Sequence, residues 1–375
     1  MHIGVNLMHL VFIDIIYGYT ADRPDMPEAL GGTTTAVCFM AREMTKAGIK
    51  CSLVNPVEEK KTAHGITTYP LASIIELCDD PSVSAFIFCG RWNAEFVELL
   101  KQRTRVPFIA WMHESCFEPR FVQPLPQFEG IVFVSNWQAK TNEANTSFRW
   151  KKAIIQNAMH PCFADIFADG ENILDAKSDP PTLFFAGDFP RGAFHIMPVL
   201  DELRSIDQNF AAEIFTSATF SPNPKTDKEY SDKLKNHPNI SHVGKVGQIE
   251  LAARAKKAAI MIAPNPWPET SCINLIQSMT AGMLCVITDR AVLPETANGF
   301  ARIVPMEDRD NPSSFNMKID HKAFAKEIAA ALEEWRSNKA LEEKLQDQRK
   351  FFLDHYQWSQ RVQPWVNFIT QMSQY

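Results

Sequence analysis

The stretch NPWPETSCINLIQSMTAGMLCVITD, residues 265–289, indicates how this chain folds. Two prolines and an acid precede an almost wholly apolar segment, and a glycine then leads into the apolar run Leu284–Thr288. A second apolar run, Ala259–Ala263, lies just before the stretch. Short apolar runs bounded by proline and glycine are typical of buried strands. The region therefore predicts a strand, a proline-rich loop, a helix that begins near Ser271, and a second strand.

The same alternation of apolar runs and helical segments extends along the whole chain. Strands are expected at Ile3–Leu7 (or Leu10–Ile16), Lys50–Val54, Ala85–Cys89, Pro107–Met112, Gly130–Val134, Ala153–Gln156, Thr182–Ala186, Ala212–Thr216, Ile240–Val243, Ala259–Ala263, Leu284–Thr288 and Ala301–Val304. Helical patterns lie between them, at Thr34–Ala47, Asn93–Gln102, Ile196–Arg204 and Ile249–Lys257. Apolar runs without strict alternation suit strands covered on both faces, and strand–helix alternation produces parallel sheets. The predicted fold class is α/β.

The alternation breaks once, in the segment FADGENILDAKSDPP at residues 167–181. This segment is polar and acidic and ends in two prolines, which is typical of a linker. The chain is therefore expected to contain two Rossmann-like domains, residues 1–172 and 180–353, with parallel sheets that face each other across a cleft.

Composition and charge restrict the classes of protein to which the chain can belong. It has 375 residues, of which 45% are hydrophobic and 22% charged, as is ordinary for a globular protein. The net charge of -6 argues against nucleic acid as the main partner, because nucleic-acid binders usually carry a basic face. None of the eight cysteines belongs to a CxxC pair, and most lie in apolar runs. They are expected to be small buried residues in a reducing compartment rather than metal ligands or disulfides.

The amino-terminal 24 residues are apolar, but they lack a basic start and carry Asp14, which is unlike a signal peptide. No run of about 18 uncharged apolar residues occurs, the length that a transmembrane helix needs. We therefore expect no transmembrane span, and a cytoplasmic protein.

Polar residues and glycines follow most of the expected strands. Ligands of parallel sheets bind beyond the carboxyl ends of the strands. The residues at these positions are Gly90, Arg91, His113, Glu114, Ser135, Asn136, Asn157, Gly187, Asp188, Gly244, Lys245, Pro264 to Ser271, and Asp289. Loops are polar in any protein, so a single member of this set indicates little, but the set as a whole predicts a binding site.

The helix expected near Ser271 has a distinctive first turn. Its free backbone N–H groups form an anion site, and Ser271 or Thr270 can cap them. Thr270, Asn274, Gln277 and Ser278 recur at helical spacing on an otherwise apolar helix. This polar stripe is either the solvent face of the helix or the lining of the interdomain cleft.

These residues resemble the donor-site signature of family 4 glycosyltransferases of the GT-B fold. In that signature an acid, seven residues and a second acid precede a small-residue helix end, a glycine and a strand. The matching segment here is PWPETSCINLIQSMTAGMLCVIT (266–288), whose PETSC variant is similar to a bacterial subgroup. Other segments resemble family landmarks in the right order: GGTTTAVCFMAREMTKAGIKCSLV, WMHES, IVFVSNWQAKT, IIQNAMHPCF, LFFAGDFPRGAFHIMPVL, HVGKVGQIELAARAKKAAIMIAP and YQWSQRVQPWVNFI. The resemblance spans nearly the whole chain and implies that residues 354–375 form a helix that packs back on the first domain.

The resemblance implies a metal-independent, retaining transfer of a sugar from a nucleoside-diphosphate sugar to a hydroxyl acceptor, with no cofactor. Glu269 would then bind sugar hydroxyls, Gln277 the ribose, and Arg191 the diphosphate. His113 would contact the sugar or the acceptor from the first domain, and His113, Glu269 and Arg191 are the expected catalytic residues. Further donor contacts are expected from Gly31, Gly32, Gly187, Lys245, Thr270, Ser271, Cys272 and Glu295.

Two positions depart from the family's pattern. Gln277 stands in place of the second acid, and Asp188 stands where an arginine is common. These departures keep open a non-catalytic partner subunit of another glycosyltransferase. A nucleotide-sugar 2-epimerase shares the GT-B architecture but normally carries more carboxylates around the sugar. A dinucleotide oxidoreductase normally has GxGxxG after its first strand, and this chain has no such match.

The sequence leaves the substrates and the oligomeric state open. UDP, GDP and ADP donors are not distinguished, and the acceptor is a saccharide, a lipid-linked group or a small molecule. The loop Phe117–Glu129 is expected to shape the acceptor site, because its prolines and aromatics suit an apolar or a saccharide acceptor equally. Exposed aromatics there would also allow peripheral membrane contact, for which the acidic net charge gives no support.

Overall fold

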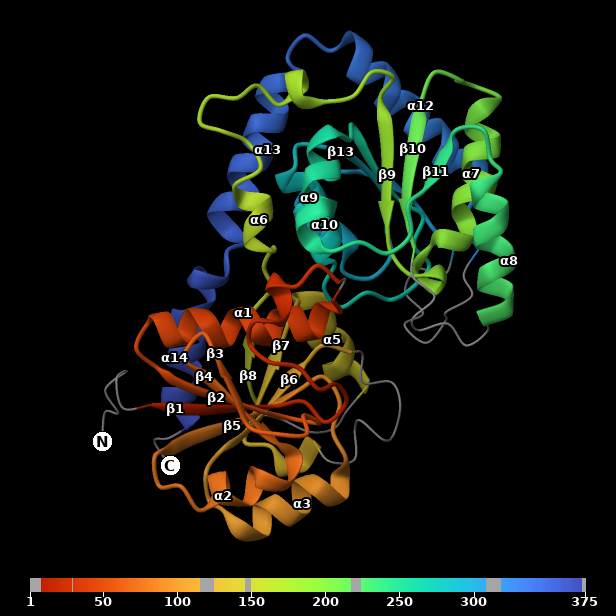
Figure 1. The fold of residues 1–375 in the computed structure, drawn as a ribbon. Helices are drawn as coiled ribbons and strands as arrows, with labels where there is room; N and C mark the ends of the chain where they lie inside the picture. Colours follow the sequence, from red (N-terminus) through yellow and green to blue (C-terminus); the bar gives the residue numbers. More distant parts are fainter. Residues whose placement is uncertain are drawn as a thin grey trace. The chain divides into compact units, whose positions relative to one another are not determined.

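The chain forms two compact units (Figure 1). The computed structural model describes residues 8–28, 30–114, 125–145, 150–216, 224–307 and 318–372. Unit 1 contains Met1–Met26, Leu30–Ala158 and Gln357–Tyr375, and unit 2 contains Pro27–Ala29 and Met159–Tyr356. The chain thus passes into unit 2 at Met159, and the expected linker, residues 167–181, belongs to unit 2.

Unit 1 is built on an eight-stranded sheet with the order β3-β4-β2-β1-β5-β6-β7-β8. The strands are β1 (His9–Ile13), β2 (Lys50–Asn55), β3 (Lys61–Ala63), β4 (Ile66–Pro70), β5 (Val83–Cys89), β6 (Phe108–Met112), β7 (Gly130–Phe133) and β8 (Lys151–Ile154). Neighbouring strands are parallel except for the hairpin β3–β4. The central strands are buried along their whole length, as parallel strands covered on both faces should be.

Helices cover both faces of this sheet. They are η2 (Arg23–Asp25), α1 (Gly32–Lys46), η3 (Leu71–Ser73), α2 (Ile74–Cys78), α3 (Ala94–Arg103), η4 (Leu125–Gln127), α5 (Asn136–Asn145), η7 (Trp358–Arg361) and α14 (Val362–Met372). Apolar residues of α1 and α14 pack in one core, on one face, and those of α2 and α3 pack in a second core on the other face (Figure 1).

The carboxyl-terminal helix α14 is part of the unit 1 core. Trp365 is fully buried, with its ring centroid 5.2 Å from that of Trp111 on β6. A Cβ atom at Gly130 on β7 would lie 2.8 Å from Phe368 Cζ, so the helix packs directly on the backbone of the sheet. The last described residues of the chain therefore complete the domain that its first residues begin.

His9 ties three strands together near the amino-terminal end of β1. Its Nε2 lies 2.9 Å from Ser52 Oγ on β2, and its Nδ1 lies 3.0 Å from Ser82 Oγ just before β5. Burial lowers the pKa of His9 to about 4, Lys50 acts in the same direction, and Asp80 partly offsets them. His9 is therefore neutral at neutral pH.

We expect His9 to make the stability of the protein pH-dependent. Its folded-state pKa lies below the ordinary value of 6.5, so the unfolded chain binds the proton more tightly. The stability is complete above pH 6.5 and falls as the pH drops toward 4, a loss of about 2 kcal/mol between pH 7.5 and 5 from this group alone. Urea unfolding of the wild type and His9→Gln at both pH values should show a smaller loss in the variant. Equal losses in the two proteins would contradict the assignment.

Unit 2 is built on a six-stranded parallel sheet with the order β11-β10-β9-β12-β13-β14. The strands are β9 (Thr182–Ala186), β10 (Ala211–Phe215), β11 (Ile240–His242), β12 (Ile260–Ala263), β13 (Leu284–Thr288) and β14 (Arg302–Val304). The chain runs outward from β9 to β11 and then returns to β12 on the other side of β9. The switch point of the topology therefore lies between β9 and β12.

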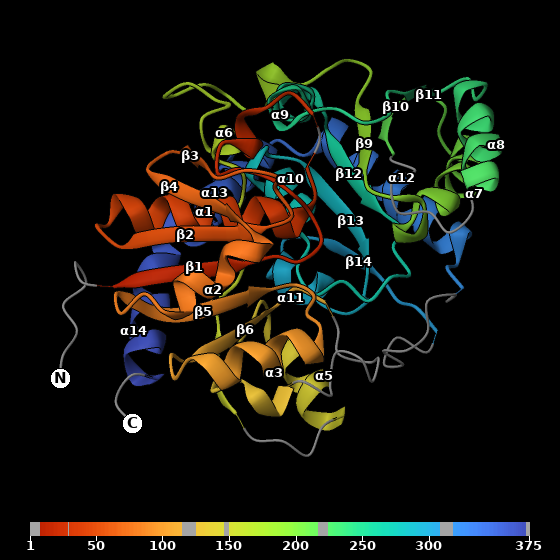
Figure 2. The same cartoon turned by 60° about the horizontal axis from the view of Figure 1, so that its bottom comes forward.

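Two helical layers cover this sheet as well (Figure 2). The helices are α6 (Pro161–Ala164), η5 (Leu174–Ala176), η6 (Phe189–Arg191), α7 (Ala193–Arg204), α8 (Pro224–Lys235), α9 (Gln248–Lys257), α10 (Ile273–Thr280), α11 (Leu293–Ala297), α12 (His321–Ser337) and α13 (Leu341–His355). Apolar residues of α7 and α12 pack in one core, and those of α6, α9, α10 and α11 in the other.

The α/β class with two parallel-sheet, Rossmann-like domains is confirmed. The strand alternative Leu10–Ile16 corresponds to β1, whereas Ile3–Leu7 lies outside the described residues. The hairpin β3–β4 was not predicted, because β3 is exposed and carries no apolar run. Its tight turn is formed by His64 and Gly65, which have positive φ angles of 51° and 74°.

Candidate functional site

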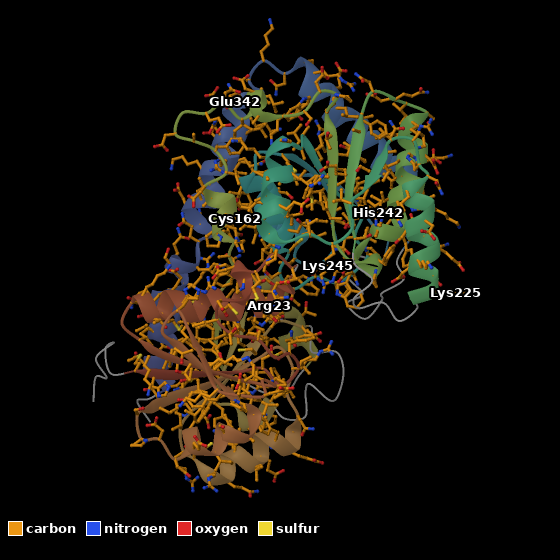
Figure 3. The ribbon with its side chains drawn as sticks, viewed as in Figure 1. Arg23, Cys162, Lys225, His242, Lys245 and Glu342 are labelled. Atoms are coloured by element: carbon orange, nitrogen blue, oxygen red, sulfur yellow. The ribbon has the colours of Figure 1, made fainter. Side chains whose placement is uncertain are left out.

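The carboxyl ends of the unit 2 strands carry most of the predicted site residues. The loops after β9 and β12 flank the switch point, where ligands of open α/β sheets bind. The first loop carries Arg191 and the second carries Glu269. The loop after β11 carries Lys245, which lies beyond the carboxyl ends of the strands (Figure 3).

The loop after β9 is held tightly against its neighbours. Gly187 donates its backbone N–H to Phe215 O on β10 at 3.0 Å. Gly192 has a φ angle of 116°, and a Cβ atom there would lie 2.6 Å from Pro264 O. Only glycine allows both this backbone conformation and this close approach of two main chains. Gly192 thus brings the β9 loop into backbone contact with the β12 loop.

The loop after β12 is fixed by hydrogen bonds from its own residues and from the β13 side. Asn265 Oδ1 accepts the backbone N–H of Trp267 at 2.9 Å, and Thr288 Oγ1 donates to Asn265 O at 2.8 Å. The Nε of Arg290 donates to Pro266 O at 3.2 Å, and Arg290 is completely buried. Arg290 was not predicted from the sequence, where the available signal was a charged residue two positions after the strongly apolar strand β13.

Arg191 and Glu269 form an ion pair in this structure. Nη1 of Arg191 lies 2.9 Å from both carboxylate oxygens of Glu269. The Glu269 side chain is 9% exposed and that of Arg191 is 45% exposed. The carboxylate of Glu269 raises the pKa of Arg191, against burial, which lowers it. Among the described residues only Nη1 has a hydrogen-bond partner, so Nε and Nη2 remain available to a ligand.

Two more groups orient this pair. The Nδ2 of Asn265 lies 3.4 Å from Glu269 Oε1, and the guanidinium of Arg191 lies 5.8 Å from the Trp267 ring centroid. The backbone N–H of Val292 contacts Glu269 O at 3.3 Å, which links Glu269 to the start of α11 and its partly buried Glu295. Both the carboxylate and the backbone of Glu269 are therefore held by neighbouring residues, as a binding group requires.

The start of α10 differs from the sequence prediction. The helix begins at Ile273, its N-cap is Cys272, and the Cys272 side chain makes no capping hydrogen bond. The predicted cap by Ser271 or Thr270 is therefore wrong, because the proline-rich loop extends further than expected. Asn274 Nδ2 instead donates to Ala186 O at the end of β9, at 2.8 Å. Burial raises the pKa of the Cys272 thiol to about 12, so this thiol is protonated at neutral pH.

The polar stripe of α10 is not a solvent face. Gln277 is 3% exposed and Ser278 is 1% exposed. The Nε2 of Gln277 donates to Gln248 Oε1 at 2.9 Å, at the first residue of α9. The stripe therefore joins α10 to its neighbours inside unit 2.

Asp188 lies in an environment of mixed charge. Burial raises the pKa of its carboxyl, and Glu269 and Asp227 act in the same direction. Arg191 and Lys245 lower this pKa. Asp188 is thus influenced by two cations and two other carboxylates, which come from the loops after β9, β11 and β12 and from the first turn of α8.

The remaining predicted residues belong to unit 1. His113 follows β6, and its ring centroid lies 4.6 Å from that of Trp111. Burial lowers the pKa of His113 to about 4, whereas the Trp111 backbone and the Asn157 side chain act against this change. Gly31 has an ordinary φ angle of -69° at the N-cap of α1, and a Cβ atom there would meet nothing within 4 Å. Gly32 is the first residue of α1. The fold of unit 1 would therefore accept a residue larger than glycine at position 31.

No group of three or more His, Cys, Asp or Glu side chains that could hold a metal ion occurs within the described residues. In the same part of the chain, no helix is both long and apolar enough to cross a membrane. Residues 117–124 of the loop expected to shape the acceptor site lie outside the described residues.

The chain matches no family model and no curated protein, but it resembles solved structures over almost its whole length. A glycosyltransferase from Rickettsia africae is 13% identical, with a TM-score of 0.75 over 98% of this chain and 99% of that one. The sucrose-phosphate synthase of Thermosynechococcus elongatus is 12% identical, with a TM-score of 0.69 over 97% and 98%. Anabaena HepE, solved in complex with UDP and glucose, is 9% identical, with a TM-score of 0.69 over 97% and 100%. At these identities the likeness is one of fold, and the chain accordingly has the GT-B fold of these glycosyltransferase structures.

Proposed function

We propose that the protein is a retaining glycosyltransferase that moves a sugar from a nucleoside-diphosphate sugar to a hydroxyl group of a saccharide, lipid-linked or small-molecule acceptor. The observation that carries this proposal is the pairing of Arg191 with Glu269 at the switch point of unit 2. The guanidinium is suited to phosphate, and the carboxylate is suited to hydroxyl groups. A sugar diphosphate presents phosphate oxygens and hydroxyl groups next to each other, so it can contact both side chains. The fold shared with glycosyltransferase structures supports the same proposal.

The proposed reaction breaks the bond between the anomeric carbon of the sugar and a diphosphate oxygen. The acceptor oxygen forms a new bond to that carbon on the same face, and the acceptor's proton passes to the departing phosphate. Negative charge grows on the diphosphate in the transition state, so cations and N–H groups must point toward it. Arg191 Nε and Nη2, the Lys245 ammonium and the first N–H groups of α10 would supply this charge, and we propose no resident metal or cofactor.

Glu269 would accept hydrogen bonds from sugar hydroxyls with the lone pairs that Arg191 leaves free, because each carboxylate oxygen has two. Gln277 would contact the ribose, and His113, neutral at pH 7, would contact the sugar or the acceptor from unit 1. The further donor contacts in this proposal are Gly31, Gly32, Gly187, Thr270, Ser271, Cys272 and Glu295. The proposal also includes membership of the bacterial PETSC subgroup of family 4 and a cytoplasmic reaction.

A second candidate function is that of a non-catalytic partner subunit of another glycosyltransferase. Gln277 favours it, because it stands in place of the family's second acid and its amide nitrogen already donates to Gln248. Asp188 favours it as well, because it adds negative charge beside Arg191. Such a partner would release no nucleoside diphosphate from a nucleotide sugar, so donor turnover separates the two candidates.

Arg191→Ala is expected to lower the rate of sugar transfer by about 30- to 1000-fold, equivalent to about 2–4 kcal/mol of transition-state stabilisation. The reason is the loss of the fork of donors that faces the diphosphate. The measurements are calorimetric titration with UDP, GDP, ADP and dTDP, and the rate of nucleoside-diphosphate release from the matching nucleotide sugars.

Arg103→Ala is the matched control, because it removes an exposed arginine of unit 1 that pairs with Asp79. It should change neither binding nor turnover. Unchanged affinity and turnover in Arg191→Ala would remove Arg191 from the site. If none of the four nucleotides binds the wild type, the donor site itself is rejected, and the second candidate function gains support.

A further inference from the structure

Asp188 is an acid beside Arg191, the residue proposed to bind the diphosphate, and its backbone oxygen accepts the backbone N–H of Arg191 at 3.0 Å. It directly follows Gly187 at the carboxyl end of β9 and precedes η6, which ends at Arg191. It occupies the N-cap position of η6, yet its side chain makes no capping hydrogen bond. The local fold therefore does not explain why this position carries a carboxylate.

The charges around Asp188 come from four elements of unit 2. Arg191 lies in η6, Glu269 in the loop after β12, Lys245 in the loop after β11, and Asp227 in the first turn of α8. Asp227 is 1% exposed, and its two carboxylate oxygens have no hydrogen-bond partner among the described residues. Both cations thus face acids, and Arg191 is already paired with Glu269 at 2.9 Å.

This arrangement makes the site sensitive to the charge of its ligand. A nucleotide sugar carries one negative charge on each of its two phosphates. The free nucleoside diphosphate carries a third charge above pH 7, because the second ionisation of a terminal phosphate has a pKa of about 6. The extra charge is on the terminal phosphate, the group that the sugar has just left. A neighbouring carboxylate therefore repels the terminal phosphate of the free nucleoside diphosphate more strongly than the same phosphate in the sugar ester. The difference is larger in a partly desolvated site than in water, because Coulomb energies are larger there.

We propose that Asp188 is a specificity-determining residue that favours the nucleotide sugar over the free nucleoside diphosphate and so promotes release of the product. This inference rests on the proposed function, because it assigns Asp188 a role at the same donor site. Burial raises the pKa of Asp188, so its negative charge is lost at a higher pH than that of an exposed carboxyl, and the discrimination is greatest in alkaline solution. It decreases as the pH falls, because the carboxyl and the terminal phosphate both take up protons.

The test compares the wild type with Asp188→Asn, which removes the charge at nearly constant shape and breaks no capping hydrogen bond. The dissociation constants of three pairs are measured by calorimetry at pH 8: UDP and UDP-glucose, GDP and GDP-mannose, ADP and ADP-glucose. For the pair that binds, the substitution should tighten the free diphosphate about tenfold more than the nucleotide sugar.

Asp175→Asn is the matched control. It also removes one negative charge from unit 2, but Asp175 is exposed in η5, before β9 and thus at the opposite end of the strand. It should leave the ratio of the two dissociation constants unchanged. A second variant, Asp188→Ser, keeps the test valid if the asparagine variant does not fold, and the same shift in the ratio is expected.

Two outcomes overturn the inference and leave the proposed function standing: both ligands tighten equally in Asp188→Asn, or neither changes. An equal shift in Asp175→Asn also overturns it, because the effect would then reflect net charge alone. If none of the six ligands binds the wild type, the proposed function fails first, and the inference fails with it.

Discussion

Replacing Glu269 with glutamine is expected to reduce sugar transfer about 1000-fold, equivalent to about 4 kcal/mol of transition-state stabilisation. Glutamine keeps the shape of the side chain but loses the charge and half of the acceptor capacity that the sugar hydroxyls would use. The substitution also removes one of the two oxygen partners of Arg191 Nη1, which lies 2.9 Å from both Glu269 oxygens, and the charge that holds the guanidinium. The affinity for the free nucleoside diphosphate should therefore be kept or increased. Initial rates of nucleoside-diphosphate release and calorimetric dissociation constants measure the two effects separately.

Glu250→Gln is the matched control, because it breaks a similar pair with Arg254 on the surface of α9, at 3.0 Å. It should change neither the rate nor the affinity. If Glu269→Gln instead weakens nucleotide binding as much as it slows transfer, Glu269 acts through the phosphate-binding group and not on the sugar. Because Arg191 is 45% exposed, water can solvate it after the substitution, and the fold should survive.

Gly192→Val is expected to destabilise unit 2 by about 3 kcal/mol, the combined size of backbone strain at positive φ and a steric collision in a packed region. The φ angle of Gly192 is 116°, and an added Cβ atom would lie 2.6 Å from Pro264 O. The β9 and β12 loops would have to separate, and the Arg191–Glu269 pair would separate with them. Urea unfolding measures the loss of stability, and nucleotide titration measures the damage to the site.

Gly299→Val separates the collision from the strain. Gly299 also has a positive φ angle, 84°, but a Cβ atom there would meet nothing within 4 Å. The variant should be destabilised by backbone strain alone, and it should bind nucleotide like the wild type. Equal destabilisation in the two variants would mean that the contact with Pro264 contributes nothing, and that the close approach of the two loops is unimportant.

The sequence predicts best those parts of the fold that are buried, because burial requires a recognisable run of apolar residues. The strands β9 and β13 are apolar along their length because helices cover both of their faces, and their limits agree with the prediction at both ends. The hairpin β3–β4 has no such pattern, since β3 is exposed and its partner is half-buried. The register of this hairpin depends on the turn His64–Gly65, in which both residues have positive φ angles. Histidine rarely adopts such an angle, so the sequence does not indicate the turn.

The sequence suggested members for the candidate site but could not predict the contacts between them. Resemblance to a family's motifs selected Arg191 and Glu269, which are separated by 78 positions. No periodicity connects residues so far apart, and only the strand order brings their loops together. The burial of Gln277 and of Arg290 could not be predicted either, because a polar residue on an apolar helix or after an apolar strand normally faces water.

The course of the chain has a consequence for its biosynthesis. Unit 1 takes its last core helix, with the fully buried Trp365, from residues that follow all of unit 2. A chain emerging from the ribosome presents residues 9–154, with every strand of unit 1, long before that helix exists. Unit 2, apart from three residues, is continuous in sequence and can fold as soon as it has emerged. The domain that is made first is therefore the last to be finished, and until then its sheet exposes the apolar surface on which chaperones act.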